Sequence, residues 1–124
     1  MSLDIEIYKS ENGRCQIELN GRLDTHTSQK LETCLAGLDV GELPIQILDM
    51  QNLNYISSAG LRCIFKAKKV VVAAGGRLLL VNLQPPVKKV LDIIKALPTY
   101  AVFASNAELD EYLDKMQKQG AAGH

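Results

Sequence analysis

The stretch from Leu48 to Phe65 most constrains how this chain can fold, because it joins three different patterns without a break. It begins at the end of a nearly continuous apolar run, which predicts a buried strand. A polar segment with two adjacent serines, Ser57 and Ser58, comes next. The apolar residues that then recur at helical spacing are Leu61, Ile64, Phe65 and Val72. The stretch predicts a strand, a polar loop and a helix in direct succession.

Ser57 and Ser58 are expected where this loop meets the helix. Serine is a favoured N-cap, because its oxygen accepts a hydrogen bond from a free N–H of the first turn. The same helix end carries partial positive charge and unpaired N–H groups, so it also tolerates an added phosphate. On the residues alone, an ordinary cap is favoured over a phosphorylation site.

The N-terminal part of the chain predicts a β-hairpin followed by a turn. Residues 3–9 and 15–19 alternate between apolar and polar side chains, which is typical of half-buried strands. Asn12-Gly13 lies between them and is a strong hairpin signal. Gly21–Asp24 is expected to form the next turn, with Asp24 or Thr25 capping a helix.

The remaining chain alternates between helix and strand patterns with short connections. The expected elements are a helix through Leu31–Leu38, a strand at Ile45–Met50, a helix at Ser58–Ala74, a strand at Arg77–Asn82, a helix from Pro85 that ends at Pro98, a strand at Tyr100–Phe103 and a helix after Ser105. The order β-β-α-β-α-β-α-β-α predicts a single α/β domain with a mixed, mostly parallel sheet of about five strands and four helices. We expect this domain to span residues 1–118 and a flexible tail to span residues 119–124.

Composition narrows the classes of function. The chain has 124 residues, and its 14 basic and 14 acidic side chains give no net charge, which argues against a nucleic-acid binder. It has no apolar run long enough to span a bilayer and no signal-peptide pattern, so we expect a cytoplasmic protein. Its three cysteines are widely spaced and lack a CxxC motif, which predicts small core residues and no disulfide or zinc site. No cofactor is expected.

Enzyme motifs are also missing from the sequence. Neither a G-x-S-x-G elbow nor a phosphate-binding P-loop occurs, and His26 is the one internal histidine. Asp24 and Asp49 could pair as catalytic carboxylates, but helix capping and strand-end solvation are the favoured interpretations. The basic face of the central helix carries Arg62, Lys66, Lys68 and Lys69. We expect this face to be a solvated exterior, with a partner surface as the alternative.

Three segments resemble the STAS domain of anti-sigma factor antagonists. Gly21-Arg22-Leu23-Asp24 resembles the G-x-L-D turn of that family, and Ile47–Met50 resembles its hydrophobic strand that ends in aspartate. Tyr55–Leu61 resembles the family's (F/Y)-(I/M)-D-S-(S/T/A)-G-L motif. The element order matches as well, so the resemblance covers nearly the whole chain.

The resemblance implies a bacterial, phosphorylation-regulated partner switch in transcription, without catalysis of its own. Ser58 matches the serine that a serine-kinase anti-sigma factor phosphorylates, and Ser57 is the second choice. Ser57 stands where the motif has aspartate, so the chain departs from the pattern there. The expected partner-binding residues are Asp24, Asp49, Leu53, Tyr55, Ile56, Ser57, Gly60 and Arg62. A phosphate would release the kinase, with Asp24 and Asp49 adding repulsion, and a PP2C-type phosphatase would reverse the switch.

Other interpretations of the chain remain open. A STAS-like structural subunit of a transport or signalling complex would bind partners without cycling through phosphorylation. A small hydrolase would use Ser58 or Cys63 as nucleophile and would need a base beside it. The apolar residues Leu53, Tyr55 and Ile56 have a second interpretation, in which they pack the loop onto the core.

Overall fold

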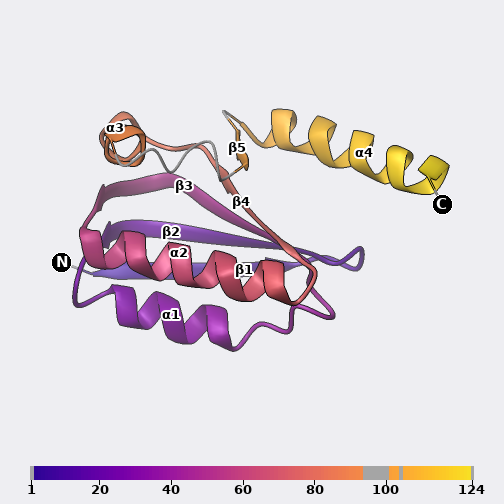
Figure 1. Cartoon of the computed structure of the whole chain (residues 1–124). Coiled ribbons are helices and arrows are strands. Elements are labelled where there is room, and N and C mark those ends of the chain that lie inside the picture. Colours follow the sequence, from indigo (N-terminus) through magenta and orange to yellow (C-terminus); the bar gives the residue numbers. More distant parts are fainter. Residues whose placement is uncertain (1, 94–100, 104, 124) are drawn as a thin grey trace.

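The computed structural model describes residues 2–93, 101–103 and 105–123. Strands and helices follow one another in the expected order (Figure 1). They are β1 (Leu3–Lys9), β2 (Arg14–Leu23), α1 (Ser28–Ala36), β3 (Ile45–Ile56), α2 (Ser58–Ala73), β4 (Arg77–Val81), α3 (Pro85–Ile93), β5 (Ala101–Phe103) and α4 (Asn106–Gly123). The expected helix end at Pro98 and strand start at Tyr100 lie outside the described residues.

The strands form one sheet in the order β1-β2-β3-β4-β5. β1 and β2 are an antiparallel hairpin, whereas β2–β3, β3–β4 and β4–β5 are parallel pairs. The predicted mixed, mostly parallel sheet is therefore confirmed. Each strand pairs with its neighbour in sequence, so the connections between the parallel strands are short crossovers through a single helix.

The two faces of the sheet are covered by different helices. Right-handed crossovers between adjacent parallel strands place the connecting helices on one face, and α1 and α2 lie side by side there (Figure 1). Side chains of α1, α2 and α3 share one buried cluster with Leu48 and Leu80. On the opposite face, Leu109 and Leu113 of α4 pack with Ile47, Leu79 and Val81.

The segment Gly21–Leu23 is the end of β2, so the expected turn at Gly21–Asp24 is wrong for most of its length. The β2–β3 register shifts between Gly21 and Arg22, which marks a β-bulge. Gly21 has φ +120°, and a Cβ atom on it would lie 2.3 Å from the backbone oxygen of Ser2. Glycine is therefore required here for a bulge rather than for a turn.

The segment 51–56 is also strand, whereas a polar loop was predicted. β3 continues to Ile56 because its polar second half pairs in parallel with Asn20–Leu23 of β2. Within this half, Leu53 and Ile56 face the core and are nearly inaccessible. Leu53 and Ile56 lie three positions apart, and the register shifts against β2 allow both to face the core. Pairing with β2 and the burial of these two side chains explain why so polar a sequence forms a strand.

Smaller differences concern α2 and the C-terminal helix. Val71 of α2 is buried, while Val72, expected on the inner face, is 53% exposed.

Cys15 and Cys63 are core residues as predicted, and Cys34 is half-buried. α4 includes residues 119–123, for which a flexible tail was predicted, and the boundary between domain and tail stays a prediction.

Candidate functional site

The ends of β2 and β3 bring together two of the segments that the sequence singled out. Leu23 and Ile56 are register partners at these strand ends. The backbone N–H of Ser57 donates to the backbone oxygen of Leu23 at 2.8 Å. The turn that begins at Asp24 therefore lies beside the start of α2, although more than thirty residues separate them in sequence.

Ser57 is the N-cap of α2. Its backbone is extended, and its Oγ accepts a hydrogen bond from the N–H of Gly60 at 3.2 Å. The side chain is half-buried. One of the free N–H groups of the first turn is thus satisfied by Ser57, which gives this serine a structural role.

Ser58 has a different environment from Ser57. It is the first residue of α2, and its side chain is exposed. Among the described residues, no group forms a hydrogen bond with its hydroxyl. The N–H groups of Ser58 and Ala59 belong to the first turn and have no intrahelical acceptor. The hydroxyl of Ser58 is therefore open to a modifying enzyme and lies at a helix end that favours negative charge.

Gly60 allows α2 to approach β2 closely. A Cβ atom at this position would lie 2.7 Å from Cγ of Leu23 and 3.0 Å from the backbone oxygen of Leu23. Leu23 is completely buried. Gly60 is itself buried, so it shapes the site through this contact and offers no surface to a partner.

Asp24 organises the turn beside Ser57. Its Oδ1 accepts from the N–H groups of His26 at 2.9 Å and Thr27 at 3.0 Å. The Thr27 hydroxyl donates to the backbone oxygen of Arg22 at 2.7 Å. The hydrogen bond from the Thr27 N–H lowers the pKa of Asp24 below its usual value; desolvation opposes this lowering, and the hydrogen bond from His26 adds to it. Asp24 is therefore ionised at neutral pH.

An aromatic residue and two arginines border the serines. The Tyr55 side chain is 40% exposed, and the Arg22 guanidinium carbon lies 4.1 Å from the centre of its ring, a cation–π contact. Arg62, one turn after Ser58, is exposed. Leu53 and Ile56 are buried, so for these two residues the packing interpretation is favoured over partner contact.

Asp49 does not lie at the end of its strand, so that expectation is wrong. Its Oδ1 accepts from the Gln51 N–H at 3.1 Å and from Asn82 Nδ2 at 3.1 Å. Its Oδ2 accepts from Gln16 Nε2 at 3.1 Å. The side chain is buried, and at ~3.3 Å per residue it lies roughly 20 Å along β3 from Ile56. The structure thus separates Asp49 from the serines and gives it a role in joining β2, β3 and β4.

The groups that a hydrolase would need are not brought together. Cys63 is buried, its thiol donates to the backbone oxygen of Ser28 at 3.5 Å, and burial, with a smaller effect of Glu32, raises its pKa to about 11. Such a thiol is almost entirely protonated at neutral pH and is a poor nucleophile. Among the residues that the structure describes, no base accepts a hydrogen bond from the Ser58 hydroxyl. These residues also hold no cluster of metal-ligating side chains, and none of their helices is long and apolar enough to span a membrane.

Sequence reasoning missed the Arg22–Tyr55 contact and the polar partners of Asp49. The Arg22–Tyr55 contact and the side-chain partners of Asp49, Gln16 and Asn82, come from neighbouring segments, so they depend on the register of β2 against β3 and of β3 against β4. A register cannot be read from one strand alone. A local signal existed for Leu53, since a single aliphatic side chain among polar residues indicates a buried position.

The geometry defines a small α/β domain. In it, the exposed Ser58 begins α2, and the turn that Asp24 stabilises lies beside that helix end. The STAS domain family profile matches residues 4–114. The chain therefore belongs to the STAS domain family.

Relatives with an assigned role are similar over most of the chain. An anti-sigma F factor antagonist of Paenibacillus polymyxa is 29% identical over 104 residues, which cover 81% of this chain and 88% of that protein. BtrV of Bordetella bronchiseptica, to which the role of anti-sigma factor antagonist is assigned by inference, is 36% identical over 85 residues, covering 68% and 72%. Among solved structures, the phosphorylated form of the Bacillus cell fate determinant SpoIIAA has a TM-score of 0.70 at 19% identity, covering 89% of this chain and 99% of that one. At this identity, the structural likeness shows the fold alone.

Proposed function

We propose that this protein is an anti-sigma factor antagonist that binds a serine-kinase anti-sigma factor and is released when Ser58 is phosphorylated. One observation carries the proposal: Ser57 already caps α2, so the exposed hydroxyl of Ser58 is left without a structural role. The proposal is supported by the roles assigned to the two relatives and by SpoIIAA, a neighbour in fold that has been solved in a phosphorylated form.

The start of α2 suits a phosphate in the free protein. A phosphate on Ser58 would add about −1.5 to −2 charges next to the unpaired N–H groups of Ser58 and Ala59. The helix dipole contributes typically ~0.3–1 kcal/mol to such a charge. Arg62 follows Ser58 at i+4 and is exposed, so its guanidinium is within one turn of the phosphate.

The same phosphate would oppose docking. A partner that covers the start of α2 must desolvate the phosphate. It must also enclose that phosphate together with the carboxylate of Asp24, which is already ionised. Like charges brought together at an interface are strongly unfavourable. We expect the affinity for the kinase to fall about 30- to 100-fold on phosphorylation.

The partner surface is proposed to be narrower than the sequence suggested. Asp24, Tyr55 and Arg62 have accessible side chains around Ser58 and are retained as contact residues. Ser57 and Gly60 act by positioning α2. The buried positions of Leu53, Ile56 and Asp49 remove them from the proposed contact.

Intact-mass measurement after incubation with ATP and a candidate serine-kinase anti-sigma factor tests the proposal. We expect the wild type and Ser57→Ala to gain one phosphate, Ser58→Ala to gain none, and a PP2C-type phosphatase to remove it. Loss of the phosphate in Ser57→Ala alone would move the site by one residue. Stable binding of the kinase without any phosphate transfer would instead favour a structural subunit that does not cycle.

A further inference from the structure

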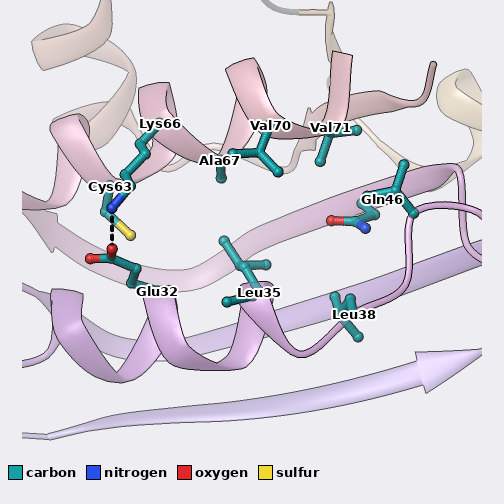
Figure 2. Close-up of a pocket in the computed structure, with 11 residues that line it drawn as sticks. Glu32, Leu35, Leu38, Gln46, Cys63, Lys66, Ala67, Val70 and Val71 are labelled. Carbon is teal, nitrogen blue, oxygen red and sulfur yellow. Dashed lines mark hydrogen bonds and ion pairs between the residues drawn. The ribbon is translucent and has the colours of Figure 1, made fainter. Parts of the chain in front are cut away.

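A cavity of about 190 Å³ lies between α1 and α2, apart from the proposed switch (Figure 2). On α2 it is lined by residues from Cys63 to Val71, and the first turn, which carries Ser58, takes no part. Most of its wall is apolar. The apolar lining residues include Leu35, Leu38, Val40, Ala67, Val70 and Val71.

One end of the cavity is closed by a charged pair. Lys66 Nζ of α2 lies 2.5 Å from Glu32 Oε1 of α1, and Figure 2 shows these side chains bridging the two helices. Because the two charges already neutralise each other, the cavity offers no unpaired charge to a ligand. An ionic ligand is therefore disfavoured.

Gln46 is the buried polar group of this cavity. Its side chain belongs to a residue only 1% exposed, and its Nε2 donates a long hydrogen bond of 3.4 Å to the backbone oxygen of Leu43. Its Oε1 has no partner among the residues that the structure describes. Since no side-chain nitrogen or oxygen atom there is both fully enclosed and unpartnered, this oxygen must border open space. Figure 2 shows it directed into the gap between the helices.

We infer that the cavity binds a small, neutral, largely apolar molecule that carries one hydrogen-bond donor for Gln46 Oε1. The size argument comes from dry apolar cavities of about 150 Å³, which accept a benzene ring. The donor argument follows from the geometry, because Nε2 is already engaged and fixes Oε1 as the free acceptor. A molecule with one aromatic ring and one hydroxyl or N–H group fits both requirements.

Phenol and toluene are a matched pair of probes, since they differ mainly in the hydroxyl donor. Each is titrated into the full-length protein while ¹H–¹⁵N NMR spectra are recorded. We expect saturable shifts at amides around Ala67 and Leu35, with phenol bound more tightly than toluene. In Gln46→Met, which removes the acceptor and keeps the apolar chain length, this preference falls about three- to tenfold, as expected for loss of one hydrogen bond.

Filling the cavity provides the second test. Ala67 points into the space between the helices (Figure 2), so Ala67→Leu should abolish binding of both probes. Ala73→Leu is the matched control, because Ala73 is an exposed residue of the same helix outside the cavity lining. Thermal melts confirm that each variant is folded. Shifts that do not saturate at millimolar probe, or that survive in folded Ala67→Leu, would overturn the site, and an unchanged phenol preference in Gln46→Met would overturn the assigned chemistry.

Discussion

Replacing Gly60 with alanine tests the packing that positions Ser58. The added Cβ would meet the Leu23 Cγ at 2.7 Å and Cδ2 at 3.0 Å, well inside an ordinary carbon–carbon contact of about 3.5–4.0 Å. Leu23 is completely buried and cannot swing into solvent. The start of α2 must therefore move away from β2 by several tenths of an ångström.

The net effect is the difference between two opposing contributions. Overpacking of a buried contact costs about 1–3 kcal/mol. Alanine is better than glycine in a helix by about 1 kcal/mol, which offsets part of this cost. A 2.7 Å contact with a fully buried side chain belongs to the upper part of that range, about 2–3 kcal/mol, so we expect Gly60→Ala to lower the free energy of unfolding by about 1–2 kcal/mol. For a chain of this size, the melting temperature should fall by roughly 3–10 °C.

Urea unfolding of Gly60→Ala, with Gly37→Ala as control, measures this effect. A Cβ on Gly37 would find its nearest neighbour at 3.6 Å, an ordinary contact, so Gly37→Ala should be neutral or slightly stabilising. Combining Gly60→Ala with Leu23→Ala should recover part of the loss, seen as a favourable coupling free energy. A Gly60→Ala protein as stable as Gly37→Ala would refute the argument that close approach requires glycine.

Three further outcomes are expected at the same site and in the sheet. Ser57→Ala should lower the free energy of unfolding by about 1 kcal/mol through loss of the N-cap, whereas Ser58→Ala should stay within about 0.5 kcal/mol of the wild type, both measured by urea unfolding. Asp49→Ala leaves three partly buried or exposed donors without their buried acceptor and should cost about 1–2 kcal/mol, while Asp49→Asn, which keeps one acceptor oxygen, should cost less in the same assay. The pKa of Asp24 is lowered by folding, so its ionised form stabilises the protein above pH ~4 and this contribution is lost as the pH falls. The melting temperature of Asp24→Asn should thus lie below that of the wild type at pH 6, and circular dichroism melts should show the gap narrowing at pH 3.

The order of elements and the parallel pairing could be predicted because periodicity and turn residues are local signals. The two errors at Gly21–Leu23 and 51–56 share one cause. Each segment is polar or glycine-containing, and each becomes strand only because the other lies beside it. Such pairing is a tertiary effect that overrides local preference.

The sequence also predicted part of the candidate site. The position of Ser57 and Ser58 at a helix start follows from local sequence, and the structure separates them into a cap and an exposed hydroxyl. The sequence places Asp49 near the end of its strand, whereas β3 continues to Ile56. The burial of Asp49 depends on amides from β2 and from the end of β4, which no local pattern reveals.

The division of the core between two sheet faces has a consequence for synthesis of the chain. The face with Ile47, Leu79 and Val81 is completed once β4 exists, but the side chains that cover it belong to α4. At about 5–20 residues per second, translation from Val81 to Leu113 takes roughly 2–6 seconds. During that interval the nascent chain exposes an aliphatic surface on a sheet whose other face already has its own helices. A nascent chain from which β4, but not yet α4, has left the ribosome should therefore present an exposed aliphatic sheet face to chaperones.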